Sequence, residues 1–205
     1  MVKVIPKFLA AAGLIACFAW MHAARAVEIE SVKIDDKVTL AGGAPELVLN
    51  GAGVRHKFVF VKVYIGSLYL AKKNADSGAI FADPGAKRVS MHILSNEVTA
   101  QDLISSMNNA LAANLSPHEL ALLEKRIRDL NSMMSTIKTI NKGSVVNLDY
   151  IPDAGTRVIV NGQERITIPG EDFFRGMLHI WIGDKPVDGR LRDAMLGKTG
   201  GGKLF

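Results

Sequence analysis

The sequence predicts an α+β fold in which strands precede a pair of helices and further strands follow them. Three observations support this prediction. Apolar and polar residues alternate over 27–34, the run over 58–70 is apolar on both faces, and two helix start signals follow residue 98. Because strands and helices are grouped and do not alternate, the order favours α+β over a parallel, alternating fold.

The first 26 residues are predicted to be a secretory signal peptide. Lys3 and Lys7 precede an apolar stretch from Phe8 to Trp20, and Ala24-Arg25-Ala26 places small residues at the positions that define cleavage. A transmembrane anchor is the alternative, but a span needs roughly 20 apolar residues and this stretch is shorter. We therefore expect cleavage after Ala26 and a periplasmic or secreted protein.

A second alternative for the amino terminus is a lipoprotein. Leu14-Ile15-Ala16-Cys17 resembles a bacterial lipobox, which would make Cys17 a lipidated first residue. The segment after Cys17 stays apolar and leads to a better-placed cleavage site. The lipoprotein therefore ranks below the soluble exported form.

Charge and composition indicate a single domain, and they give no reason to expect a nucleic-acid partner. The chain has 25 basic and 20 acidic residues, and three of the basic residues lie in the signal peptide, which leaves 22 against 20, or +2. We expect a single domain over 27–197 with no membrane span, followed by a flexible Gly-rich tail over 198–205. Cys17 is the only cysteine, so the mature protein has no disulfide.

The first half of the domain is predicted to be mostly strands. Residues 27–34 alternate as one strand, and Leu47–Leu49 forms a short strand before a turn at Gly51 and Gly53. Phe58–Leu70 is apolar on both faces and is therefore expected to be buried on both faces, with Gly66 marking a bulge or a close backbone approach. Residues 88–94 form the next strand.

Two helices are expected in the middle of the chain. Thr99 with Asp102 caps the first, and Ser116-Pro117-His118-Glu119 opens the second as a capping box. An apolar stripe that includes Met134 runs along the second helix until 141–143. We interpret its methionines as core residues and not as a ligand surface.

The last third returns to strands and ends in helices. Residues 145–151 and 156–168 are predicted strands, and Asn161-Gly162 divides the second of them as a hairpin turn. Residues 171–182 form an apolar helix, and a short helix follows Asp188.

The motifs of several enzyme classes are missing from the sequence. It contains no Walker phosphate loop, no dinucleotide fingerprint and no Gly-x-Ser-x-Gly nucleophile elbow. The four histidines of the mature chain lie on four different elements, so no pair has the spacing of a zinc site: His56, His92, His118 and His179. We expect no metal and no cofactor.

Arg55 is the candidate functional residue. It follows a backbone-permissive Asn50–Gly53 segment and stands at the entrance of a strand that is buried on both faces. A guanidinium there is always charged and offers paired donors that fit a carboxylate or phenolate. Because a buried, unpaired guanidinium is costly, Arg55 is expected to have an anionic partner, either an internal carboxylate or a ligand.

Several motifs together resemble the chalcone isomerase family. They occur in a consistent order over nearly the whole mature chain: Gly51-Ala52-Gly53-Val54-Arg55, Phe60-Val61-Lys62, Leu68-Tyr69-Leu70, Arg88-Val89 with Ile93-Leu94, and Phe173–Gly183 followed by Pro186 and Val187. The resemblance implies an open-faced β-sandwich, a large antiparallel sheet covered by a layer of helices, with a ligand cleft between sheet and helices.

The resemblance also suggests site residues. Arg55 lies at the position of the arginine that guides a phenolate in the plant isomerases, whereas Tyr64 replaces their strand threonine. Gln101 falls where those enzymes have a helix tyrosine, and Asn108 matches their helix asparagine. Arg55 with Tyr64 is similar to the fatty-acid-binding branch of the fold, in which an arginine and a tyrosine hold a carboxylate.

We therefore expect a binder of a small apolar anion, such as a fatty acid, with Arg55, Tyr64, Asn108 and Gln101 as ligand-binding residues. One alternative is an isomerase or intramolecular lyase acting on a chalcone-like phenol, with Arg55 as the catalytic residue. Another is a non-catalytic envelope scaffold in which Arg55 pairs with an internal carboxylate.

Overall fold

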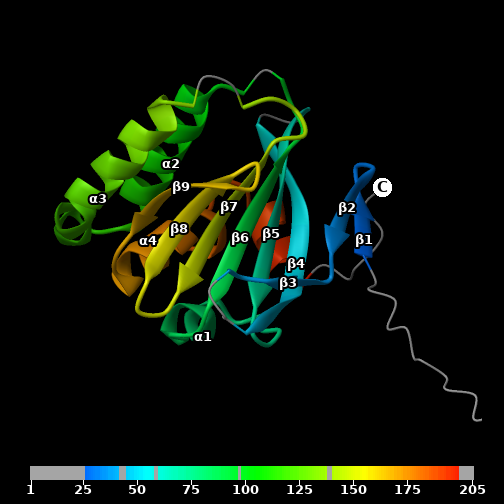
Figure 1. The fold of residues 1–205 in the computed structure, drawn as a ribbon, viewed down its shortest axis with the longest axis horizontal. Coiled ribbons are helices and arrows are strands. Elements are labelled where there is room, and N and C mark those ends of the chain that lie inside the picture. The colour runs from blue at the N-terminus through cyan, green and yellow to red at the C-terminus, as the bar shows by residue number, and fades with distance from the viewer. Residues whose placement is uncertain (1–25, 42–44, 58–59, 97, 138–139, 199–205) are drawn as a thin grey trace, which may run out of the picture.

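The computed structural model describes residues 26–41, 45–57, 60–96, 98–137 and 140–198. Within them, seven strands form one antiparallel sheet in the order β3-β4-β5-β6-β7-β8-β9, and a separate hairpin pairs β1 with β2 (Figure 1). The strands are β1 Ala26–Ile29, β2 Val32–Asp35, β3 Lys37–Thr39, β4 Glu46–Lys57, β5 Val61–Leu70, β6 Lys87–Ile93, β7 Val145–Ile151, β8 Gly155–Val160 and β9 Gln163–Ile168. Every strand of the large sheet pairs with its neighbours in the sequence, so the sheet is a meander.

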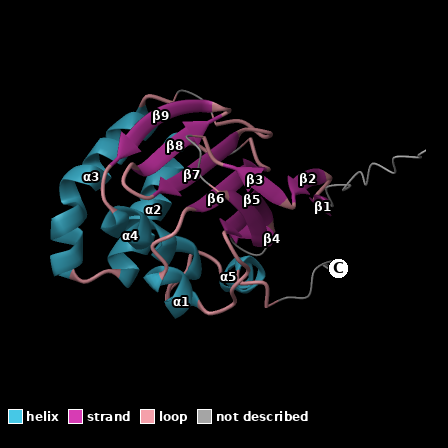
Figure 2. Ribbon diagram, turned by 60° about the horizontal axis from the view of Figure 1, so that its bottom comes forward, coloured by secondary structure: helices cyan, strands magenta, loops and turns pink. Residues whose placement is uncertain are grey.

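The helices gather on one face of this sheet, as Figure 2 shows. They are α1 Ser77–Ala82, α2 Ala100–Asn114, α3 Pro117–Ser135, α4 Glu171–Ile182 and α5 Gly189–Met195. The main core lies between sheet and helices, and a second apolar cluster joins the N-terminal hairpin to the other face. The predicted α+β class, a large antiparallel sheet under a layer of helices, is confirmed. No helix in these described segments is long and apolar enough to span a membrane.

One strand was predicted over 27–34, but the structure has two strands there, the hairpin of β1 and β2. Glu30 and Ser31 have φ angles of 52° and 60°, the positive values of a two-residue turn that matches strand twist. Alternation continues on both sides of this turn, so periodicity alone did not reveal the reversal. The expected signal peptide falls on residues outside the described ranges, apart from Ala26 in β1.

The predicted glycine turn is wrong, because Gly51 and Gly53 lie inside β4. A Cβ on Gly51 would stand 2.0 Å from the backbone oxygen of Ala194, and one on Gly53 would stand 2.6 Å from the Ala194 Cβ. Both glycines therefore let α5 pack directly on the strand. They lack a side chain because the helix lies close, and not because the backbone turns.

The chain reverses later than expected, between β4 and β5. Phe60, predicted to lie in a strand, is a turn residue that is 88% exposed, and β5 begins at Val61. Phe58 and Val59 lie outside the described residues. The apolar run over this segment therefore does not mark a single buried strand.

Burial of β5 on both faces is confirmed. Tyr64 and Leu68 join the core under the helices, whereas Ile65 and Tyr69 join the second cluster. The pairing of β5 is regular through Gly66. The two register irregularities skip Asn50 of β4 and Val63 of β5. The bulge expected on β5 is therefore at Val63 and not at Gly66. A Cβ on Gly66 would meet the Leu191 side chain at 3.2 Å, so the expected close approach is present.

The helix starts were predicted correctly. Thr99 and Asp102 form one complete capping box, and Ser116 and Glu119 form another. The second helix ends at Ser135, earlier than expected. The turn predicted within 156–168 separates β8 from β9, while α1 and β3 were not anticipated.

Candidate functional site

A cavity lies between α2, α3 and α4 on one side and strands β4 to β8 on the other. It contains about 640 Å³ of space free of protein atoms, part of it open to solvent, and about 60 Å³ of this can hold the centre of a water-sized molecule. Of its nineteen lining residues, fifteen are aliphatic or methionine. The other four carry the polar groups: Arg55, Tyr64, Ser106 and Trp181.

Arg55 and Tyr64 are brought together by strand register. They are directly paired residues of β4 and β5, and the guanidinium carbon lies 5.4 Å from the centre of the Tyr64 ring. This geometry is a cation–π contact. The register shifts between Arg55 and His56, and such irregularities re-aim side chains at the ends of paired segments.

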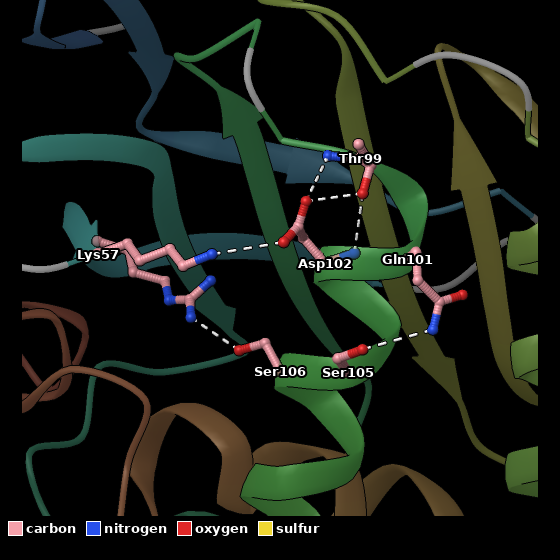
Figure 3. A network of polar contacts seen from close by, with 7 residues as sticks. Lys57, Thr99, Gln101, Asp102, Ser105 and Ser106 are labelled. Atoms are coloured by element: carbon pink, nitrogen blue, oxygen red, sulfur yellow. Dashed lines mark hydrogen bonds and ion pairs between the residues drawn. The ribbon is translucent and has the colours of Figure 1, made fainter.

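Helix α2 supplies the nearest partner of Arg55. The Arg55 Nη2 atom donates a hydrogen bond to the Ser106 Oγ atom over 2.7 Å, and Figure 3 shows Ser106 pointing from α2 toward this contact. The Nε atom of Arg55 is buried and makes no hydrogen bond. No carboxylate in the described segments lies within 4.0 Å of its nitrogens.

Two other arginines show how this chain pairs a guanidinium internally. Arg88 makes two hydrogen bonds of 2.5 and 2.6 Å to the buried Asp149. Arg126 makes a similar pair to Asp172, at 2.7 and 2.6 Å. Arg55 has only a neutral hydroxyl and an aromatic ring, so its charge faces the cavity without such compensation.

Tyr64 is held by α4. The Trp181 Nε1 atom donates to the Tyr64 hydroxyl oxygen over 2.9 Å, and both side chains are buried. Burial raises the pKa of the Tyr64 phenol, against the opposing effect of Arg55, so the phenol stays protonated at neutral pH. Tryptophan and arginine can only donate, and no described residue accepts the hydroxyl proton of Tyr64.

The polar end of the cavity is therefore a cluster of donors. Arg55 contributes a charge, Tyr64 and Ser106 contribute hydroxyl protons, and the buried Nε of Arg55 is unused. An anion placed there would accept charge-assisted hydrogen bonds, whereas a donor group would find only the hydroxyl oxygens of Tyr64 and Ser106, each of which already accepts one hydrogen bond. The arrangement suits a molecule with an anionic head and an apolar body.

Polar contacts connect the C-terminal end of β4 with helices α2 and α5. The Lys57 Nζ atom lies 3.4 Å from an oxygen of Asp102, which belongs to the capping box of α2 (Figure 3). The backbone nitrogen of His56 donates to Asp188, the N-cap of α5, over 3.0 Å. These contacts hold the strand segment that carries Arg55 against both helices.

The structure does not bring Gln101 and Asn108 to the cavity. Gln101 is exposed, and its Nε2 atom donates to Ser105 over 3.4 Å on the other side of α2 from Ser106 (Figure 3). Asn108 accepts a hydrogen bond of 3.3 Å from Asn131 of α3. The cavity face of α2 follows Leu103, Ser106 and Met107 at helical spacing, and Gln101 and Asn108 lie off this face. Ligand binding by these two residues stays a prediction.

Sequence reasoning missed Ser106, Trp181 and the methionines of the cavity wall. Ser106 is three positions after Leu103, so its place on the apolar face of α2 was a usable signal. Met133 and Met134 pack against the main core, as interpreted, and they also line the cavity. No group of three histidines, cysteines or carboxylates in the described ranges could hold a metal.

Comparison with known proteins identifies the family. Residues 26–197 match the model of the chalcone isomerase-like family, and the chain belongs to that family. Among solved structures, it is similar to the crystal structure of a fatty-acid binding protein from Arabidopsis thaliana, with a TM-score of 0.62 and 14% identity over 85% of this chain and 97% of that chain. At this identity the likeness shows the fold. A search of curated proteins gave no match.

Proposed function

We propose that the protein binds a fatty acid, with its carboxylate at Arg55 and its alkyl chain between sheet and helices. The observation that carries this proposal is a guanidinium with no carboxylate partner among the described residues, placed at the donor-rich end of an apolar cavity. Tyr64 and Ser106 donate to the same carboxylate. The fatty-acid binding named for the Arabidopsis protein of this fold supports the choice of ligand.

Physical chemistry favours an anion at this end. Removing a guanidinium from water is costly unless an opposite charge and hydrogen bonds compensate. A bound carboxylate supplies both, and it uses the paired donors of arginine in the geometry they prefer. The alkyl chain contributes by leaving water, at about 0.8 kcal/mol for each buried CH₂ group.

Replacing Arg55 by alanine tests the proposal. We expect Arg55→Ala to weaken binding of palmitate or oleate by about 1.5–3 kcal/mol, the range for a hydrogen bond to a charged group. Titration calorimetry measures this loss, and thermal unfolding without ligand should change much less. The matched control is Arg165→Ala, since Arg165 is exposed on β9 and away from the cavity.

The outcome that contradicts the proposal is specific. If Arg55→Ala unfolds the protein and the unchanged protein binds no fatty acid, Arg55 has a structural role and the scaffold alternative is favoured. Arg55→Lys adds a second measurement, because it keeps the charge but loses the paired donors.

An isomerase is the second candidate, because the same donors would stabilise a phenolate or an enolate oxygen. Catalysis requires stronger binding of the transition state than of the substrate. An assay with a chalcone separates the two functions. Turnover well above the spontaneous rate, abolished by Arg55→Ala, would favour the isomerase over the binder.

We also propose that the protein is exported and that its mature form begins at Val27. The Ala24-Arg25-Ala26 cleavage pattern supports this proposal. Intact-mass measurement of protein from a bacterial envelope fraction tests it. A diacylated species beginning at Cys17 would contradict it and favour the lipoprotein.

A further inference from the structure

We propose that the cavity selects its ligand by the carboxylate and accepts alkyl chains that differ in length and in cis unsaturation. This inference rests on the proposed function and extends it to the class of acids that bind. The observation behind it is the distribution of methionine. Five of the six methionines after residue 26 line this one cavity: Met91, Met107, Met133, Met134 and Met177.

The five methionines come from both walls of the cavity. Met91 lies on β6 of the sheet, Met107 on α2, and Met177 on α4. Met133 and Met134 follow each other near the end of α3, where both are only half-buried. An alkyl chain between sheet and helices therefore meets thioether side chains from either side.

Methionine gives these walls a property that leucine or isoleucine would not give. Its side chain is unbranched, has three rotatable bonds and carries a polarizable sulfur, so it adapts to irregular shapes and appears at promiscuous binding surfaces. β-branched residues, in contrast, are stiff at their first torsion. A cavity wall rich in methionine can follow a straight saturated chain or a chain bent by a cis double bond.

The carboxylate end has the opposite character. Tyr64 lies on a central strand, is buried and is fixed by the hydrogen bond from Trp181. Arg55 is held by Ser106 and by the Tyr64 ring. Preorganised donors discriminate strongly against a ligand that cannot use them, whereas one extra methylene in an apolar pocket changes binding only modestly. Selection is therefore concentrated at the head group.

Titration calorimetry on the delipidated mature protein tests this inference with palmitate, stearate, oleate, linoleate and methyl oleate. We expect the Kd values of the four acids to agree within about threefold, because adaptable walls compensate for chain shape. We expect methyl oleate, which has no charge for Arg55, to bind at least about tenfold more weakly than oleate.

A matched set of variants tests whether the methionines cause the tolerance for chain length and cis unsaturation. In Met107→Leu/Met134→Leu/Met177→Leu the side-chain volume is nearly kept while flexibility falls. We expect the Kd values of the four acids to spread beyond about tenfold in this variant. Met195→Leu is the control, since Met195 is buried in α5 and does not line the cavity, and it should leave the spread unchanged.

The outcomes separate this inference from the proposed function. If one acid binds to the unchanged protein more than about tenfold tighter than the other three, or if methyl oleate binds as tightly as oleate, the inference is overturned while fatty-acid binding stands. If none of the acids binds, the proposed function fails and the inference fails with it. The series on the unchanged protein decides the question even if the triple variant does not fold.

Discussion

Tyr64 takes part both in the packing of the fold and in the proposed ligand site. Its hydroxyl oxygen accepts the hydrogen bond from Trp181, and its ring lies against the Arg55 guanidinium. The same hydroxyl has a proton without an acceptor among the described residues. One side chain therefore completes the packing of α4 on the sheet and offers a donor to the cavity.

Tyr64→Phe is expected to destabilise the protein by about 1–3 kcal/mol, because the buried Trp181 Nε1–H group loses its acceptor. Urea unfolding measures this loss. In the double variant Tyr64→Phe/Trp181→Phe no donor is left unpaired, so the loss of stability should be smaller than the sum of the losses in the two single variants.

The same double variant separates the two roles of Tyr64. Its affinity for oleate should stay below that of the unchanged protein, because the hydroxyl donor is still missing. If Tyr64→Phe alone unfolds at the same urea concentration as the unchanged protein, the hydrogen bond from Trp181 does not stabilise the fold.

At the scale of elements, the contact of α5 with β4 depends on two glycines. Gly51 and Gly53 leave room for the backbone and side chain of Ala194. Asn50 strengthens this contact, since its Nδ2 atom donates to the Met195 carbonyl oxygen over 2.7 Å from a buried position. These contacts position α5, whose N-cap residue Asp188 accepts a hydrogen bond from His56, next to Arg55.

Gly51→Ala is expected to destabilise the protein by about 1–3 kcal/mol, the usual cost of forcing extra atoms into a packed contact. The added Cβ would stand 2.0 Å from the Ala194 backbone oxygen, so the helix must move. Thermal or urea unfolding measures the change.

Gly189→Ala is the control for this prediction. It places a methyl group on the same helix where no atom lies within 4 Å, and alanine is the better helix former. Equal destabilisation by both substitutions would show that α5 does not depend on close approach to β4.

At the scale of the whole molecule, two half-buried histidines link stability to pH. Burial lowers the pKa of His92 below 6.5, against a smaller opposing effect of Asp35. Burial also lowers the pKa of His179, which stacks on Phe81 at a ring separation of 4.2 Å. Glu119 and Asp184 act against this shift, and Arg175 acts with it.

Stability is therefore expected to fall as the pH drops below 6.5. In that range the unfolded chain takes up protons on these histidines while the folded protein does not, so protonation favours unfolding. The carboxylates with a lowered pKa, such as Asp172 through its hydrogen bonds from Arg126, respond only at more acidic pH. Urea unfolding at pH 7.5 and 5.5 measures the effect.

His179→Phe should reduce this pH dependence, because it keeps a ring against Phe81 but removes one titrating group. His118→Gln is the control, since His118 is exposed on α3. The prediction is wrong if the urea midpoint is the same at both pH values, or if His118→Gln reduces the dependence as much as His179→Phe.

The sequence by itself determined the features that depend on near neighbours. The capping boxes at Thr99 and Ser116, the hairpin turn at Asn161 and the class of the fold could all be predicted. The caps and the turn are local arrangements, because their physical cause lies within a few residues of chain, and the class of the fold follows from the order of such local elements. Arg55 could also be singled out, since a cation just before an apolar run requires an explanation wherever the chain folds.

Only the tertiary structure decided what surrounds Arg55. The hydrogen bond between Tyr64 and Trp181 joins residues 117 positions apart, and Ser106 reaches Arg55 from a helix 51 positions away. The role of Gly51 became clear only from the packing of α5. No local pattern encodes such contacts, because they depend on how strands and helices pack together, and the same glycines or methionines would suit a turn or a core equally well.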